Sequence, residues 1–177
     1  MDFVGKDAPG QNCPKGVACN LSLGGGQSTM VNAAAANLPR KGIFVAVAAG
    51  NDGADASAYS PASEPSVCTI GATDIDDSLA TYSNIGRGVD MLAPGTKIKS
   101  TWMRGGTNTI SGTSMASPHV AGLAAYFLGM GRQASGLCQF LASRSIKDTV
   151  SGVPSSTPNL PINNRQTGNN GTVFRRF

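Results

Sequence analysis

The sequence predicts an α/β fold with a mainly parallel sheet, because apolar and alanine-rich segments alternate along its first third. An apolar segment at 17–23 is followed by an alanine-rich stretch at 28–38 and a second apolar segment at 43–49. The apolar segments have the length of strands, and the stretch between them has the length of a helix that ends at Pro39 and Gly42. A strand–helix–strand unit implies two parallel strands joined by a right-handed crossover.

The rest of the chain continues the pattern. We expect further strands at 67–73 and 89–92, and a hairpin of 98–102 with 109–110 across Arg104-Gly105-Gly106. A long helix begins near Ser114, and its apolar residues on one face belong to the core: Val120, Leu123, Ala124, Phe127 and Leu128. A shorter helix is expected at 134–143. From Ser151 onward, Pro, Asn, Ser, Thr and Gly dominate, which predicts a loosely held tail.

Composition and charge exclude some classes of function. The net charge of +4 is not gathered into basic runs with aromatic residues between them, so no nucleic-acid partner is expected. The longest apolar stretches, 43–49 and 120–128, are too short to span a bilayer, so no membrane partner is expected either. Only 14% of residues are charged and 23 are glycine, which is typical of a compact, turn-rich extracellular protein.

Residues 1–4 lack the features of a secretion signal, so Met1 is interpreted as an internal methionine of a longer protein or as the start of a truncated one.

One serine occupies the place of a nucleophile. Ser114 lies in the string Gly112-Thr113-Ser114-Met115-Ala116-Ser117-Pro118-His119-Val120-Ala121-Gly122, where a loop turns into an apolar helix. The first backbone N–H groups of a helix have no partner inside it and carry the positive end of its dipole, so they can receive a developing oxyanion. The alternative is an ordinary serine cap, since serine is favoured at that position.

The string at 112–122 resembles the nucleophile segment of the subtilisin-like serine proteases, or subtilases. Residues 21–26 and 48–51 resemble the two substrate-binding segments of that family, in the family's order, and 60–68 and 12–16 resemble its proteinase K-like branch. The resemblance implies a three-layer subtilisin-like fold with a mainly parallel sheet, present here as its C-terminal portion. Residues 1–154 would be a partial subtilase (peptidase S8) catalytic domain, and 155–177 a polar, flexible tail.

The resemblance also implies roles for single residues. Ser114 would form the acyl-enzyme, and the side-chain amide of Asn51 would help to hold the oxyanion, although Asn after Gly50 is equally typical of a turn. The substrate-binding residues would be Ser22, Leu23, Gly24, Gly25, Ala48, Ala49 and Gly50. The glycines at 24–26 leave backbone exposed for an extended peptide, and they lack the pattern of a phosphate loop. The small residues predict a roomy pocket, and these segments contain no acid. The resemblance implies a tendency toward apolar or aromatic substrate side chains in that pocket.

The general base is what the sequence does not supply. The chain has one histidine, His119, five residues after Ser114 on the same predicted helix, which turns it roughly 140° away. We therefore expect His119 to be a half-buried structural residue, and in the family the catalytic Asp and His lie upstream.

The resemblance implies a secreted, monomeric serine endopeptidase of broad specificity for polypeptides, represented by a chain without its N-terminal segment. The alternative is a non-catalytic peptide-binding or truncated protease-like chain. An α/β-hydrolase is set aside because Ala116 replaces the last glycine of its motif.

Metal and disulfide sites follow from the same resemblance. Asp90, with the backbone carbonyls of Pro65 and Val67, matches a structural Ca²⁺ site, and oxygen ligands suit that ion. A second calcium site near Asp148-Thr149 is doubtful, because its other ligand would lie upstream.

Four cysteines allow three pairings. The resemblance implies a Cys68–Cys138 disulfide and a secreted setting, with the partner of Cys13 upstream and Cys19 a buried free thiol. Two sequons occur: Asn20 is expected in a buried strand and unused, and Asn170 could carry a glycan.

Overall fold

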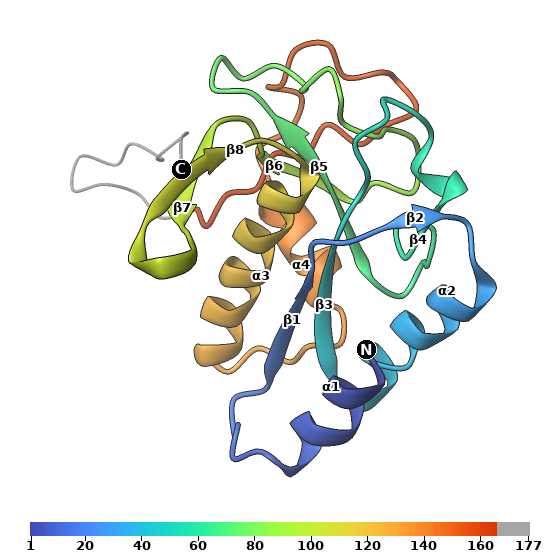
Figure 1. Cartoon of the computed structure of the whole chain (residues 1–177), viewed down its shortest axis with the longest axis vertical. Coiled ribbons are helices and arrows are strands. Elements are labelled where there is room, and N and C mark those ends of the chain that lie inside the picture. Colours follow the sequence, from blue (N-terminus) through green and yellow to red (C-terminus); the bar gives the residue numbers. More distant parts are fainter. Residues whose placement is uncertain (166–177) are drawn as a thin grey trace.

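Four parallel strands form the central sheet of the computed structural model, which describes residues 1–165 (Figure 1). Their order is β1-β3-β5-β6, and every neighbouring pair is parallel. The strands are β1 (Val17–Leu21), β3 (Ile43–Ala48), β5 (Cys68–Thr73) and β6 (Met91–Pro94). The predicted α/β fold with a mainly parallel sheet is confirmed.

The middle of the sheet is covered by helices on both faces. All residues of β3 are buried, and alternate side chains of a strand point to opposite faces. Phe44 and Ala46 pack in one apolar cluster, whereas Val45 and Val47 pack in another on the opposite side. Helices α3 (Thr113–Gly129) and α4 (Leu137–Arg144) contribute to the first cluster, and α1 (Asp2–Asp7) and α2 (Thr29–Ala36) border the second. The result is the three-layer arrangement that the resemblance implies.

Helix α3 lies along one face of the sheet and contacts all four strands (Figure 1). Ala116 and Ala124 are fully buried, and their small side chains let the helix approach the strands closely. Pro118 stands in the second turn, and Val120 and Phe127 complete the buried face. The predicted core face is confirmed, with Leu123 only half-buried.

The hairpin of β7 (Ile98–Thr101) and β8 (Thr107–Ile110) leads directly into α3, as predicted. A second, very short pairing was not predicted: β2 (Gly25–Gly26) runs antiparallel to β4 (Tyr59–Ser60). The short 3-10 turns are η1 (Ala8–Gly10), η2 (Pro39–Lys41), η3 (Ala56–Ala58) and η4 (Met103–Gly105).

The prediction of a loosely held segment from Ser151 is wrong for residues 151–165. The Leu92 N–H donates to Leu160 O at 3.1 Å and the Ile162 N–H donates to Leu92 O at 2.9 Å, so this segment runs beside β6. Thr157 is also buried. The segment covers the last strand of the sheet, which its polar composition does not reveal. The Asn170 sequon lies outside the described residues, and the division of the chain at residue 154 stays a prediction.

Among residues 1–165, no helix combines the length and the apolar character that crossing a membrane requires.

Candidate active site

Ser114 is the second residue of α3 and is half-buried at the helix N-terminus. The Gly112 N–H donates to Gly95 O at 2.9 Å, which ties the start of the helix to the segment after β6. The Ser22 hydroxyl donates to Ser114 O at 2.6 Å, and the Ser114 hydroxyl points back to Ser22 O at 3.5 Å. The end of β1 therefore fixes the backbone of the candidate nucleophile, while its hydroxyl makes only a long contact.

Asn51 faces the same helix start from the loop that follows β3. Its Oδ1 accepts two hydrogen bonds from Thr113, one from the backbone N–H and one from the hydroxyl, each 2.8 Å long. With Oδ1 turned to Thr113, Asn51 presents its Nδ2 group on the other side of the amide. A Cβ built on Gly112 would lie 3.4 Å from that Nδ2, which places the donor next to the residue that caps the helix.

Asn84 holds the loop that carries Asn51. It is fully buried, and its Oδ1 accepts from the N–H groups of Asp52 and Ala54, each at 3.0 Å, while its Nδ2 donates to Ala49 O at 2.9 Å. Gly50 has a φ of +110°, and a Cβ there would overlap the Asn84 amide. Glycine is therefore required at residue 50, and Asn84 is a positioning residue of this loop that the sequence did not predict.

A cavity of about 410 Å³ opens beside Ser114 and Asn51. Six of the seven predicted substrate-binding residues line it, and Ser22, the seventh, contacts Ser114 instead. The lining set includes Leu23, Gly24, Gly25, Ala48, Ala49, Gly50, Asn51, Thr113 and Ser114. The structure thus brings the predicted catalytic and substrate-binding residues to one place.

Two features of this cavity were not predicted. Asp52 and Tyr59 also line it, whereas the segments 21–26 and 48–51 contain no acid, as the sequence indicates. Asp52 stands just after the segment at 48–51, and Tyr59 reaches the cavity through the β2–β4 pairing. That pairing, Gly25 with Ser60 and Gly26 with Tyr59, also occupies one backbone edge of the glycines that were expected to receive a peptide.

His119 is a structural residue, as predicted. Its ring is half-buried, and Nδ1 lies 2.8 Å from Met115 O within the same helix. Because a carbonyl oxygen only accepts, Nδ1 carries the proton and donates it there. Among residues 1–165, no hydrogen bond joins the His119 ring to the Ser114 hydroxyl.

The three residues of the predicted calcium site, Pro65, Val67 and Asp90, line a single cavity of about 220 Å³. One oxygen of the Asp90 carboxylate accepts from the Thr69 N–H at 2.7 Å, and in residues 1–165 no basic side chain pairs with it. Burial raises the pKa of Asp90 above its ordinary value. A half-buried carboxylate without a counter-charge fits a hard cation with oxygen ligands.

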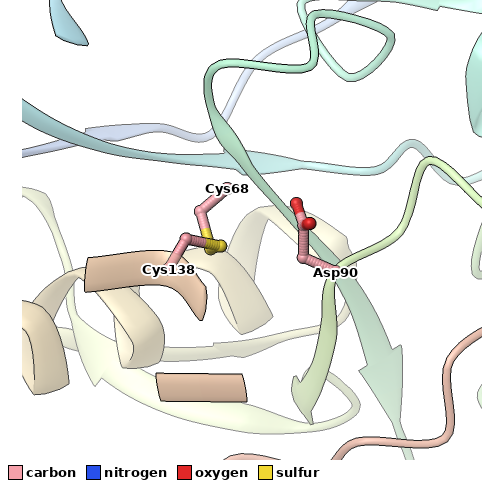
Figure 2. Close-up of side chains that lie close together, drawn as sticks. All are labelled: Cys68, Asp90 and Cys138. Atoms are coloured by element: carbon pink, nitrogen blue, oxygen red, sulfur yellow. A yellow bond between two sulfur atoms is a disulfide. The ribbon is translucent and has the colours of Figure 1, made fainter. Parts of the chain in front are cut away.

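Cys68 and Cys138 form the disulfide that the resemblance implies, and Figure 2 shows it beside Asp90. Their sulfur atoms and an Asp90 oxygen lie within 4.8 Å of one another. Both sulfurs are held in the disulfide, so they offer no thiolate to a metal and any ion here depends on oxygen ligands.

The other cysteines and sequons are placed as follows. Cys13 is exposed and free, whereas Cys19 is free and half-buried, and burial raises the pKa of its thiol.

The prediction that Asn20 is buried is wrong, because Asn20 is exposed. Its side chain still makes two hydrogen bonds: it donates to Ser22 Oγ at 2.8 Å and accepts from Ser117 Oγ at 2.6 Å. Asp148 and Thr149, considered for a second calcium site, are both exposed.

The fold and the site define an α/β protein with a serine at the start of a helix, an amide donor beside it and a cavity next to both. The model of the subtilase family, peptidase S8, matches residues 14–151, and the chain belongs to this family. The resemblance inferred from the sequence is confirmed.

The curated relatives include fungal enzymes of this kind. The chain is 62% identical over 164 residues to "Proteinase T" of Parengyodontium album, which covers 93% of the chain and 56% of that protein. It is 56% identical over 160 residues to "Alkaline serine protease ver112" of Corniculantispora psalliotae, covering 90% of the chain and 42% of that protein. The chain therefore spans about half the length of the curated relatives it matches.

A solved structure shows the same fold. The crystal structure of a cold adapted subtilisin-like serine proteinase superposes with a TM-score of 0.83 at 43% sequence identity. The match covers 90% of this chain and 57% of that chain.

Proposed function

We propose that the chain is the nucleophile-bearing part of a secreted serine endopeptidase that cleaves polypeptides through an acyl-enzyme on Ser114. The observation that carries the proposal is the pairing of Asn51 with Thr113, which orients an amide donor beside the helix N-terminus where Ser114 stands. The Ser114 N–H and the Asn51 Nδ2 would then hold the oxyanion that forms when the hydroxyl attacks a peptide carbonyl.

The hydroxyl needs a general base to take its proton. The only histidine of the sequence, His119, donates to a carbonyl of its own helix. We therefore propose that the base and its orienting carboxylate are supplied from outside these 177 residues, by a segment that precedes them in a longer protein.

The remaining cavity residues would bind the substrate. Gly24, Gly25, Ala48 and Ala49 would form the walls of the pocket for the side chain that precedes the scissile bond, and Ser22 would fix the Ser114 backbone. Ca²⁺ held by Asp90 and the carbonyls of Pro65 and Val67 would stabilise the loop before β5. Its role would be structural, and it would take no part in the chemistry.

The test uses a chimera in which the segment of Proteinase T that precedes the matched region is fused to the start of this chain. The hydrolysis of peptide anilides by this chimera is then measured. We expect turnover, its loss in Ser114→Ala, and a decrease in kcat with little change in KM in Asn51→Ala. In subtilisin, removing an oxyanion donor lowers turnover by about 10²–10³, and we expect that range here. A correctly folded chimera without any turnover would favour the alternative, a peptide-binding chain that does not cleave.

A further inference from the structure

The disulfide and Asp90 bring two sulfur atoms and a carboxylate together from three different elements. Cys68 is the first residue of β5, Asp90 directly precedes β6, and Cys138 is the second residue of α4. The two sulfur atoms and an Asp90 oxygen lie within 4.8 Å of one another, and Figure 2 shows the carboxylate beside the disulfide. In the disulfide the sulfurs are not metal ligands, but the pair of thiols from which every disulfide forms can offer two thiolates.

The spacing of these three side chains fits a tetrahedral Zn²⁺ ion. With Zn–S bonds of about 2.3 Å and a Zn–O bond of about 2.0 Å, two thiolates lie about 3.8 Å apart, and a thiolate and a carboxylate oxygen about 3.5 Å apart. The Cα atoms of Cys68 and Cys138 are 5.7 Å apart. Rotation of the two side chains is therefore enough to separate the sulfurs to that distance, and no strand or helix has to move.

Contacts other than the disulfide hold the backbone of this cluster. The Asp90 N–H donates to Thr69 O at 2.8 Å, and the Thr69 N–H donates to one Asp90 carboxylate oxygen at 2.7 Å. Asp90 is thus tied to the residue that follows Cys68. Leu137 and Leu141 of α4 are buried in the apolar cluster that α3 and the sheet share, so the helix that carries Cys138 is held by packing. The ligand atoms therefore stay close together when the disulfide is absent.

The cluster also has room for an ion and is free of competing cations. Cys68, Asp90 and Cys138 all line the cavity of about 220 Å³ described above, and no Lys, Arg or His is among its lining residues. Within residues 1–165, the second oxygen of the Asp90 carboxylate accepts no hydrogen bond. A water molecule in this cavity can complete a tetrahedral shell. Two thiolates in the set favour Zn²⁺ over Ca²⁺, because thiolate is a soft ligand.

We propose that Cys68, Cys138 and Asp90 bind one Zn²⁺ ion when the two cysteines are reduced. Oxidation by a small-molecule disulfide such as oxidised glutathione would then form the Cys68–Cys138 bond and release the ion. The two thiolates give up two electrons, and the glutathione disulfide takes up these electrons and two protons to become two thiols. Asp90 would serve Zn²⁺ in the reduced chain and Ca²⁺ in the oxidised chain. The site does not depend on peptidase activity.

The test titrates chain 1–177 with Co²⁺, which takes the place of Zn²⁺ and absorbs light when thiolates bind it. Cys13→Ser and Cys19→Ala are introduced together as the background, because both of these cysteines are free thiols that could bind the ion. A water-soluble phosphine reduces the disulfide and is itself converted to the phosphine oxide, with oxygen from water. We expect one Co²⁺ per chain with a thiolate charge-transfer band, its displacement by Zn²⁺, and its loss when oxidised glutathione is added.

Variants in this background identify the ligands. Cys138→Ser should abolish the charge-transfer band of a two-thiolate site. Asp90→Asn should weaken Co²⁺ binding at least about tenfold, since even partners outside the ligand shell contribute about 10–100-fold to metal affinity. Asp148→Asn, at an exposed residue outside the cavity, should leave the affinity unchanged. Asp90→Cys should strengthen the band, because a third thiolate replaces the carboxylate, and this gain can be measured even if Asp90→Asn does not fold.

The Tm of the reduced background chain shows whether the ion binds the folded form. We expect Zn²⁺ to raise this Tm, because a ligand of the native state stabilises it. A lower Tm with Zn²⁺ would mean that the thiols of the unfolded chain bind the ion, and would overturn the proposal. A reduced chain without a charge-transfer band would overturn it as well. Equal Co²⁺ affinities of Asp90→Asn and Asp148→Asn, with no stronger band in Asp90→Cys, would show that Asp90 is not a ligand.

Discussion

Thr113 positions Asn51: the backbone N–H and the hydroxyl of Thr113 both donate to Asn51 Oδ1, each at 2.8 Å. The residue before the candidate nucleophile thus sets the orientation of the candidate oxyanion donor. Because the Thr113 hydroxyl also accepts from the Gly50 N–H at 3.1 Å, the helix start and the loop after β3 behave as one unit.

Replacing Thr113 by valine should disturb that unit without changing its shape much. Valine keeps the branched side chain but removes the hydroxyl, so the Gly50 N–H loses its acceptor in a buried setting. We expect the free energy of unfolding to decrease by about 1–3 kcal/mol, the cost of an unsatisfied buried group. Urea denaturation of chain 1–177 measures it, with the exposed Thr109→Val as the control. Equal stability of the two variants would show that the hydroxyl does not hold the loop.

Asn84→Ala should loosen the loop more strongly. It removes the acceptor of two N–H groups, of Asp52 and Ala54, and the donor to Ala49 O, all at a fully buried position. We expect a loss of about 3 kcal/mol or more, since several buried groups lose partners at once.

In the chimera with Proteinase T, Asn84→Ala should lower kcat more than it raises KM, because it displaces the oxyanion donor through the loop. Asn37→Ala, at an exposed helix end, is the matched control. A variant with full kcat would mean that the position of Asn51 does not depend on Asn84.

Calcium should stabilise the protein through Asp90. An ion that binds only the native state adds about 2.7 kcal/mol when its concentration is 100 times the Kd. We expect the Tm of the unaltered chain to rise with Ca²⁺ and to fall again with a chelator, whereas the Tm of Asp90→Ala should not change. A calcium response that persists in Asp90→Ala, measured by differential scanning calorimetry, would place the ion elsewhere.

The Cys68–Cys138 disulfide should contribute strongly to stability, because its cysteines are 70 residues apart in the sequence. Closing a loop of that length restricts the unfolded chain and stabilises the native state by up to about 4 kcal/mol. Replacing both cysteines by alanine should lower the unfolding midpoint accordingly, whereas Cys19→Ala should not, since Cys19 is free. Equal midpoints for both variants would show that the disulfide adds nothing.

The sequence predicts the parts of this structure that depend on local pattern. The alternation of apolar strands and an alanine-rich helix places β1, α2 and β3, and the segment around Ser114 places the start of α3. The glycines and alanines of the cavity walls were found through short motifs of neighbouring residues.

What the sequence does not predict depends on contacts between distant segments. Asn84 acts on Asp52 from 32 residues away, and nothing in its neighbouring residues marks it as a partner of that loop. Tyr59 reaches the cavity through a pairing of only two residues, which is too short to leave a periodic pattern. Residues 160–162 pair beside β6, where Leu160 and Ile162 pack on the core, but three residues among Pro, Asn and Ser are too few to give a strand pattern in the sequence.

The central claim is that chain 1–177 carries a nucleophile and an oxyanion donor without a base, and hydrolysis of an apolar peptide anilide tests it most directly. The purified chain and its Ser114→Ala variant are compared, alone and joined to the preceding segment of Proteinase T. We predict no turnover above the Ser114→Ala background for the chain alone, and turnover that requires Ser114 in the joined protein. Turnover by the chain alone that disappears in Ser114→Ala would show that a base within these 177 residues serves Ser114, and would contradict the account.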